Sequence, residues 1–315
     1  MWLTDTSELV QILKDKGVSR VALQFPEGLK RQSAGIAMAL KDAGFFVIIS
    51  GDPCYGACDL ATGLLEHVDV LVHFGHSPLD SDPRILYEPF TQDFDVGSLE
   101  LAIPYLTEKE TGLVTTVQHA HMVPAAEEYF ARRNIICRAY KGTRRTPFPG
   151  QILGCSFEAA KKCPGAEILF IGTGSFHPLG VALATGKKVI ALDPYSLNIE
   201  IISVERFLRR RFALIEKARK AKNFGIILSQ KSGQRRQDLA ERLAGLKKEA
   251  IVIAMEEITP DELLNLGFSA YVNTACPRLA YDDQSRFPVP VLTPGEFEIL
   301  CGVSRFEDYK VDEIT

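Results

Sequence analysis

The chain has 315 residues, of which 46% are hydrophobic and 24% charged, and its formal net charge is −4. This composition is typical of a globular protein with ample material for a core, and the length predicts two or three domains. The slightly acidic balance indicates neither a nucleic-acid partner nor a membrane surface. No apolar run approaches the roughly 18 residues that a transmembrane helix needs.

Seven cysteines are widely spread along the chain. The segment 1–5 has neither the basic residues nor the apolar core of an export signal. An odd number of cysteines without such a signal argues against a disulfide framework, and for thiols that stay reduced, either free or bound to metal. We therefore expect a cytoplasmic protein.

The first third of the chain predicts alternating helices and strands. Asp5 or Thr6 caps a first helix that carries Leu9 and Leu13 on its apolar face. Strands are then expected at 21–25, 45–49, 69–74 and 85–87, with one helix that ends at Gly44 and a short one at 60–67.

The same alternation returns twice. In the middle third we expect strands at 114–118, 135–140, 167–171 and 188–192, with a helix at 124–133 and a short one before 167. A long helical pattern, 197–222, leads to the last third, with strands at 224–228, 250–255, 270–273 and 288–292 and helices at 238–248 and 260–266.

Repeated strand–helix–strand units predict an α/β fold with parallel sheets covered by helices. Three passes predict three similar domains, 1–104, 105–196 and 197–315, each a small parallel sheet flanked by helices, around a central site. The repeats share a glutamine near the end of each first strand (Gln24, Gln118 and Gln230) and a later cysteine.

Four cysteines lie in loops that follow predicted strands. Cys54 and Cys58 share the loop 50–59, and Cys155 and Cys276 lie in similar loops of the other two thirds. The carboxyl ends of parallel strands are where α/β sheets bind ligands. Our hypothesis is that one thiol from each third meets the others at a single metal centre.

Three thiolates with one open position suit a 4Fe-4S cluster with one iron free for substrate. Structural zinc is an alternative, although it usually shows two close cysteine pairs, and Cys54 and Cys58 have no second pair. A chain without metal also stays open on spacing alone. Position 61 is alanine, so the C-x3-C-x2-C motif of common radical S-adenosylmethionine enzymes is absent.

The remaining cysteines are expected to have structural roles. Cys137 and Cys301 lie in apolar surroundings that indicate core positions. Cys163, next to a proline at the end of a short helix, is also expected to have no chemical role.

The stretch 172–177 (GTGSFH) resembles half of a dinucleotide-binding motif, but His177 replaces the third glycine. We therefore expect no nicotinamide site, although such a loop suits close approach of its backbone to a ligand. His76 and His177 both follow strand ends, where they either face a shared cleft or make structural hydrogen bonds. The basic run 206–211, with the pairs Arg132-Arg133 and Arg144-Arg145, is expected on a solvated helix face or in salt bridges between domains. Docking of an acidic macromolecule or anchoring of a carboxylate is the alternative.

Five ordered motifs, at 51–59, 72–77, 153–155, 172–178 and 275–279, resemble the archaeal enzymes of the first step of diphthamide biosynthesis. The resemblance runs over almost the entire chain. It implies a homodimer of three similar α/β domains, each of which gives one cysteine to a 4Fe-4S cluster. The motifs place these ligands at Cys58, Cys155 and Cys276, and leave Cys54 as an extra thiol.

The resemblance also implies an activity, that of a 2-(3-amino-3-carboxypropyl)histidine synthase. An electron from the reduced cluster breaks the bond between sulfur and the γ-carbon of S-adenosylmethionine. This leaves methylthioadenosine and a 3-amino-3-carboxypropyl radical, which adds to carbon 2 of a histidine ring in translation elongation factor 2. An unidentified protein would supply the electron, and neither nucleic acid nor membrane is expected to bind.

Loops near the cluster are expected to bind S-adenosylmethionine, because glycines permit close backbone approach and a cation is needed for the methionine carboxylate. The expected contacts are Gly172, Gly174, Ser175, His177, Gln230, Lys231 and Arg278. A dehydrating enzyme similar to quinolinate synthase, also a three-domain protein with a three-cysteine cluster, is the alternative enzyme. A metal-binding protein without catalytic activity is the second alternative.

Overall fold

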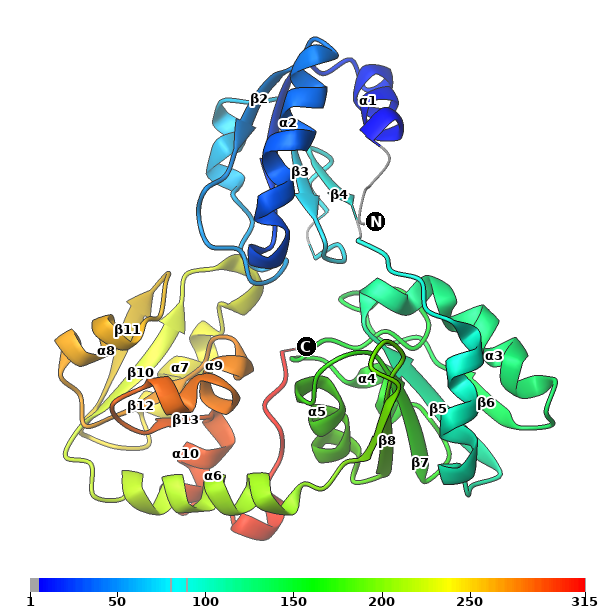
Figure 1. The fold of residues 1–315 in the computed structure, drawn as a ribbon. Helices are drawn as coiled ribbons and strands as arrows, with labels where there is room; N and C mark the ends of the chain where they lie inside the picture. The colour runs from blue at the N-terminus through cyan, green and yellow to red at the C-terminus, as the bar shows by residue number, and fades with distance from the viewer. Residues whose placement is uncertain (1–5, 80, 89, 315) are drawn as a thin grey trace.

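The computed structural model describes residues 6–79, 81–88 and 90–314. Three separate β-sheets, one from each third of the chain, surround a common centre (Figure 1). The predicted α/β class with three helix-flanked, mostly parallel sheets is confirmed. No helix in these ranges is long and apolar enough to cross a membrane.

The first sheet has the strand order β2-β1-β3-β4, and all its strands are parallel. Alternate residues of β1 face opposite sides: Val21 and Leu23 pack in one apolar cluster with Leu40, and Ala22 packs in another with Leu71. Burial of both faces explains the nearly unbroken apolar runs of these strands. The elements are β1 (Arg20–Gln24), β2 (Phe46–Ile49), β3 (Val70–Phe74), β4 (Ile85–Glu88), α1 (Thr6–Asp15), α2 (Ser33–Asp42) and the 3-10 helices η1 (Glu27–Gln32) and η2 (Thr62–Glu66).

The second sheet has the order β6-β5-β7-β8-β9, in which only β9 is antiparallel to its neighbour among the described strands. In β7, Ile168 and Phe170 face one apolar cluster, and Leu169 and Ile171 face the other. The elements are β5 (Glu110–Thr115), β6 (Ile136–Ala139), β7 (Glu167–Ile171), β8 (Lys188–Asp193), β9 (Asn198–Ile201), α3 (Val123–Ala131), α4 (Glu158–Lys161), α5 (Phe176–Thr185) and the 3-10 helices η3 (Val96–Tyr105) and η4 (Val117–Met122).

The third sheet has the order β11-β10-β12-β13, again with parallel strands. Ile226 and Leu228 of β10 face the cluster that contains Phe297, and Ile227 faces the opposite one. The elements are β10 (Phe224–Ser229), β11 (Ala250–Met255), β12 (Ala270–Asn273), β13 (Val291–Leu292), α6 (Glu205–Ala218), α7 (Gln237–Ala244), α8 (Pro260–Leu266), α9 (Pro277–Tyr281), α10 (Pro294–Leu300) and the 3-10 helices η5 (Ser232–Gln234), η6 (Asp283–Arg286) and η7 (Phe306–Asp308).

Two predicted elements are wrong in part. The helix expected at 197–222 is shorter, because a turn at Leu197, with φ of +57°, sends 198–201 back along β8 as the antiparallel strand β9. This strand lies beyond the predicted boundary at 196, yet it belongs to the second sheet. The strand expected at 114–118 begins at 110 and ends at 115, since polar Thr111 is buried and its hydroxyl donates to Glu167 at 2.9 Å.

The basic run on α6 divides into two groups. Arg206, Arg209 and Arg210 are exposed, as expected for a solvated helix face. Arg211 is buried and forms an ion pair with buried Glu296 of α10, with an Nη2–Oε2 distance of 2.5 Å. One arginine of the run therefore joins two helices of the third domain instead of facing solvent.

Candidate metal centre

Loops from all three sheets enclose a cavity of about 510 Å³ at the centre of the molecule. Cys58 follows β2, Cys155 follows β6 and Cys276 follows β12, and all three residues line this cavity. Parallel strands direct their carboxyl ends to one edge of a sheet, so three such edges facing one centre bring the three loops together. The thiols lie 97 and 121 residues apart in the chain, and only this arrangement of sheets makes them neighbours.

Cys58 is positioned by a tight turn and by a glycine from the third domain. The Asp59 carboxylate accepts hydrogen bonds from the backbone N–H groups of Tyr55 and Gly56, at 2.8 and 2.9 Å. Gly233, after β10, packs so closely that a Cβ there would lie 2.7 Å from the Sγ of Cys58. A larger residue at position 233 would displace the thiol.

Cys155 and Cys276 are fixed mainly through backbone groups. The loop around Cys155 is closed by two hydrogen bonds between the backbones of Leu153 and Ser156, 3.0 and 3.1 Å long. At the start of α9, the side-chain amide of Asn273 donates to the carbonyl of Cys276 at 2.8 Å. Backbone contacts hold both loops, so neither sulfur atom is needed to fix the position of its own residue.

The last described residues connect the loops of Cys155 and Cys276. The backbone N–H of Ile314 donates to the carbonyl of Cys155 at 2.8 Å. Asp312 pairs with Arg236 at 2.7 Å, and the same guanidinium donates to the carbonyl of Ala275 at 3.1 Å. This segment runs back to the centre from the third domain (Figure 1).

Arg145 supplies a positive charge beside two of the thiols. Its Nη2 lies 3.7 Å from the Sγ of Cys58 and 4.0 Å from the Sγ of Cys155, and it donates to the carbonyl of Gly233 at 3.2 Å. Its buried Nε has no hydrogen-bond partner among the described residues. One side chain therefore touches parts of all three domains and favours negative charge on sulfur.

Burial sets the protonation of the three thiols. It raises the pKa of Cys155 to about 11 and that of Cys276 to about 12, and it raises the pKa of Cys58 as well. Arg145 opposes this for Cys58 and Cys155 without cancelling it. The thiols are thus protonated at neutral pH, and they become thiolates only when a further positive charge, such as a metal, displaces the protons.

The spacing of the thiols distinguishes a cluster from a single ion. Among the described residues, only Cys54, His73 and His76 form a metal-ligating group whose donor atoms all lie within 4.8 Å of one another. At least one pair of the three cavity thiols is therefore more than 4.8 Å apart. Thiolates around one zinc ion lie roughly 3.8 Å apart, given zinc–sulfur bonds of about 2.3 Å. The wider spacing fits a multi-iron cluster better than zinc.

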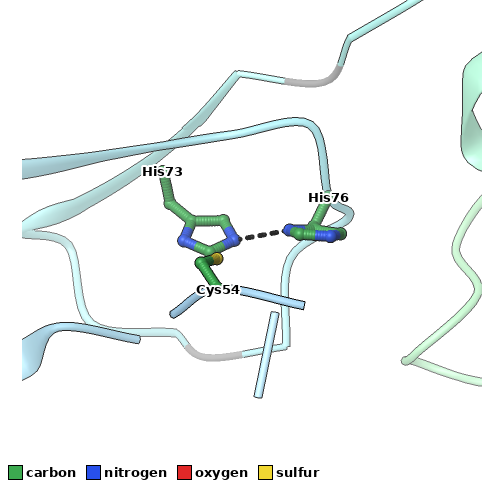
Figure 2. Close-up of side chains that lie close together, drawn as sticks. All are labelled: Cys54, His73 and His76. Atoms are coloured by element: carbon green, nitrogen blue, oxygen red, sulfur yellow. Dashed lines mark hydrogen bonds between the residues drawn. The ribbon is translucent and has the colours of Figure 1, made fainter. Parts of the chain in front are cut away.

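Cys54 lies apart from the cavity, although it precedes Cys58 by four residues. It is fully buried beside the imidazoles of His73 and His76 (Figure 2). Burial raises the pKa of Cys54 to about 12. Of the two thiols in this turn, only Cys58 lines the cavity.

The residues predicted to bind S-adenosylmethionine fall into two groups. His177, Lys231 and Arg278 line the cavity with the three cysteines. Gln230 lines a neighbouring cavity of about 910 Å³, which Cys58 and Lys231 also border. Gly172, Gly174 and Ser175 are not among the described residues that line either cavity.

The two predicted cations differ in how far they are already neutralised. Lys231 Nζ lies 2.5 Å from Asp59 and 2.6 Å from Glu257, and thereby links the first and third domains. Among the described residues, Arg278 forms an ion pair with Asp282 alone, at 3.1 Å, and its guanidinium lies over the ring of Phe176. Arg278 is therefore the freer of the two to receive a carboxylate.

Sequence reasoning missed several residues of this cavity. Arg145 lies in a loop rich in glycine, proline and arginine, and Gln234 makes a side-chain hydrogen bond to Cys58 from the η5 turn. Gln118, noted only as a repeated residue, lines the cavity and donates to the carbonyl of Gly75 at 3.4 Å. The recurrence of glutamine in each third and the basic pair Arg144-Arg145 were the available signals.

Known proteins are similar to this chain in sequence and in fold. A family described as "Putative diphthamide synthesis protein" matches residues 25–311. The chain belongs to the diphthamide synthesis family. The resemblance seen in the five sequence motifs is thus confirmed.

Curated members of the diphthamide synthesis family come from archaea and eukaryotes. The chain is 41% identical to the 2-(3-amino-3-carboxypropyl)histidine synthase of Pyrococcus horikoshii, over 98% of this chain and 92% of that protein. It is 34% identical to subunit 1 of the human synthase, over 93% of this chain and 70% of that protein.

A solved structure of the family matches the whole fold. Dph2 from Pyrococcus horikoshii with a 4Fe-4S cluster superposes with a TM-score of 0.94 at 38% identity, over 100% of this chain and 95% of that one. The arrangement of three sheets around one centre is therefore shared with a family member that holds an iron–sulfur cluster.

Proposed function

We propose that this protein catalyses the first step of diphthamide biosynthesis, the transfer of a 3-amino-3-carboxypropyl group from S-adenosylmethionine to a histidine of translation elongation factor 2. The observation that carries the proposal is the meeting of three thiols, one from each sheet, in a single cavity. Membership of the family and the synthase names of its relatives support the reaction. The same membership favours this function over the quinolinate synthase alternative.

Cys58, Cys155 and Cys276 are the proposed ligands of a 4Fe-4S cluster. The donor set fits such a cluster, because three partly buried thiols face one cavity, at least one pair of them is too far apart for a single ion, and Arg145 lies beside two of them as a counter-charge. No fourth cysteine lines the cavity among the described residues, so one iron is left for substrate. When bound and reduced, the cluster supplies the single electron that breaks the sulfur–carbon bond.

The cavity walls provide groups for S-adenosylmethionine. Arg278 is the proposed partner of the methionine carboxylate, because its guanidinium, with one ion-pair partner among the described residues, has further N–H groups to donate to a second carboxylate. His177, Gln230 and Lys231 are proposed contacts from the same two cavities. The predicted contacts Gly172, Gly174 and Ser175 belong to the loop before α5, next to His177, and stay part of the proposal.

The protein substrate has to bring one histidine ring into the central cavity. A volume of about 510 Å³ holds a cofactor fragment and one side chain but no folded domain. The histidine therefore enters on a loop or a projecting segment of elongation factor 2. A homodimer and a separate electron donor complete the proposed assembly, by resemblance to the family.

Product analysis after anaerobic reduction with dithionite tests the proposal. The expected small product is methylthioadenosine, and elongation factor 2 gains the mass of one aminocarboxypropyl unit on a histidine. Protein whose iron has been removed with a chelator is the control and yields neither product. Release of 5′-deoxyadenosine instead, or an unchanged factor mass with iron fully loaded, would refute the proposed reaction.

A further inference from the structure

Two histidines beside the cavity form a continuous hydrogen-bonded chain. His73 Nε2 lies 2.9 Å from His76 Nδ1, and His73 Nδ1 lies 2.8 Å from the side-chain carbonyl oxygen of Gln24 (Figure 2). His73 is fully buried at the end of β3, and His76 lines the central cavity. The chain therefore connects the interior of the first sheet with the site of the proposed reaction.

Gln24 fixes the direction of this chain. Its Nε2 donates to the backbone carbonyl of Asp59, and its Oε1 accepts from the backbone N–H of Ala61 at 3.1 Å. The oxygen therefore faces His73, and it can only accept. His73 Nδ1 must carry a hydrogen, so in the neutral ring Nε2 is the acceptor and receives the hydrogen of His76 Nδ1.

The other end of the chain lies at the central cavity. Because His76 Nδ1 gives its hydrogen to His73, the neutral ring of His76 carries no hydrogen on Nε2. His76 lines the cavity, so its Nε2 is the atom of the pair that is open to an added proton.

A metal ion would be the other occupant of this cluster, since Cys54 Sγ also lies within 4.8 Å of both rings. The separation of the rings argues against it. Two nitrogens bound to one tetrahedral zinc lie roughly 3.3 Å apart, given zinc–nitrogen bonds of about 2.0–2.1 Å. The 2.9 Å between His73 and His76 is the usual length of a hydrogen bond. The spacing thus indicates a proton between the rings.

We propose that the His73–His76 pair accepts the proton that leaves carbon 2 of the substrate histidine during transfer. The proposal rests on the proposed function. Over the whole reaction the sulfonium loses its S–Cγ bond, the substrate ring loses its C2–H bond and one C–C bond forms. The electron that starts the reaction is returned at its end, so no net oxidant is required and one proton is released. His76 Nε2 is the acceptor, and His73 and Gln24 position it.

The groups around the pair set its resting state. Burial lowers the pKa of His73 to about 3 and that of His76 to about 4, so both rings are neutral before reaction. The carboxylate of Asp59 acts in the opposite direction on His76 and stabilises the added proton. Cys54, whose thiol is kept protonated by burial, and the ring of Tyr87 also lie close to His73.

The test compares two products in the iron-loaded protein. The His76→Gln variant cannot take up a proton at this position. It should still release methylthioadenosine, but transfer to elongation factor 2 should fall at least tenfold. The ratio of methylthioadenosine to modified elongation factor 2 should therefore rise at least tenfold from a value near one. The matched control is His67→Gln, the same substitution at an exposed histidine of the same domain, which keeps the wild-type ratio. Nitrogen-15 NMR of the wild-type rings adds a readout without mutation, with His73 protonated at Nδ1 and unprotonated at Nε2.

Each outcome decides the role of the pair. Undiminished transfer by His76→Gln would overturn it, and so would iron loss in that variant, which would assign His76 to maintaining the cavity. If the wild-type protein contained one zinc per chain and Cys54→Ala contained none, the cluster of Cys54, His73 and His76 would be a metal site and the proposal would be wrong. Absence of methylthioadenosine from the wild-type reaction would instead refute the proposed function itself.

Discussion

Cys54 and Cys58 lie four residues apart in one loop, yet they belong to two different kinds of site. Cys54 is fully buried with His73 and His76, in a cluster made entirely by the first domain. Cys58 faces the central cavity, where its neighbours Arg145 and Gly233 come from the second and third domains. The first site is complete once one sheet folds, and the second needs three.

The difference shows how the two sites are held. The Cys54 cluster depends on the core of one sheet, so its geometry follows from the packing of β1 and β3. The cavity depends on polar contacts across domain boundaries, such as Lys231 with Asp59 and Gln118 with Gly75. Changes in interdomain contacts should therefore alter the cavity and leave the local cluster intact.

Iron content should separate the two thiols most strongly. Cys58→Ala, Cys155→Ala and Cys276→Ala are each expected to lose most bound iron, because two thiolates do not retain the cluster in water. Cys54→Ala keeps its iron, and the core variant Cys137→Ala serves as control. Iron and sulfide analysis of anaerobically purified protein measures this, and full iron in Cys155→Ala would contradict a centre with one ligand from each domain.

Loss of the interdomain ion pair should have the next largest effect. Asp59→Ala leaves partly buried Lys231 with one carboxylate instead of two and removes the acceptor of two backbone hydrogen bonds, so it is expected to lower the free energy of unfolding by about 3 kcal/mol. Urea titration measures the change. Arg209→Ala, which breaks an exposed pair with Glu205, is the control and should produce no measurable change. Equal stability of the two variants would mean that the Lys231–Asp59 ion pair does not hold the first and third domains together.

Affinity for S-adenosylmethionine should depend on Arg278 to a smaller extent. Arg278→Ala removes one charge-assisted bond and is expected to weaken binding by roughly 1.5–3 kcal/mol. Arg305→Ala, in an exposed pair with Asp308 elsewhere in the third domain, should bind as the wild type does. Calorimetry on anaerobic protein compares them, and unchanged affinity in Arg278→Ala would move the carboxylate contact to another cation.

The smallest expected effect is the pH dependence of stability that comes from the burial of His73 and His76. The unfolded chain binds protons on histidine below about pH 6.5, whereas burial lowers the folded pKa of His73 to about 3 and of His76 to about 4. Stability therefore falls as pH drops from 6.5 toward these values, by about 1 kcal/mol per ring and pH unit. His76→Gln should reduce this slope between pH 7 and 5.5, and His67→Gln should not. An unchanged slope in His76→Gln would mean that water reaches the ring.

The meeting of the three cysteines could be predicted because each one follows a strand end, and parallel strands gather their carboxyl ends at one edge. His177, Lys231 and Arg278 were accessible to the same reasoning. The place of Arg145 at the cavity was not, because its loop has no regular structure and two of its three partners are more than 80 residues away. The sequence on either side of such an arginine does not predict the position of its guanidinium.

Secondary structure failed where tertiary contacts outweigh local pattern. The apolar spacing of 197–222 fits a helix throughout, but pairing with β8 makes 198–201 a strand. Similarly, Thr111 looks unsuited to a buried strand until Glu167 is seen to accept its hydrogen bond. Both errors come from partners outside the window that periodicity can inspect.

The connection from Asp312, Glu313 and Ile314 to the loops of Cys155 and Cys276 has a consequence for the order of assembly during synthesis. These residues emerge from the ribosome after every strand of the three sheets, and domains generally fold as they emerge. A nascent chain interrupted before residue 312 already carries every described strand of the three sheets and all three cavity cysteines. It still lacks residues 312–314, which join the loops of Cys155 and Cys276. Completion of the metal centre should therefore follow the folding of the domains that surround it.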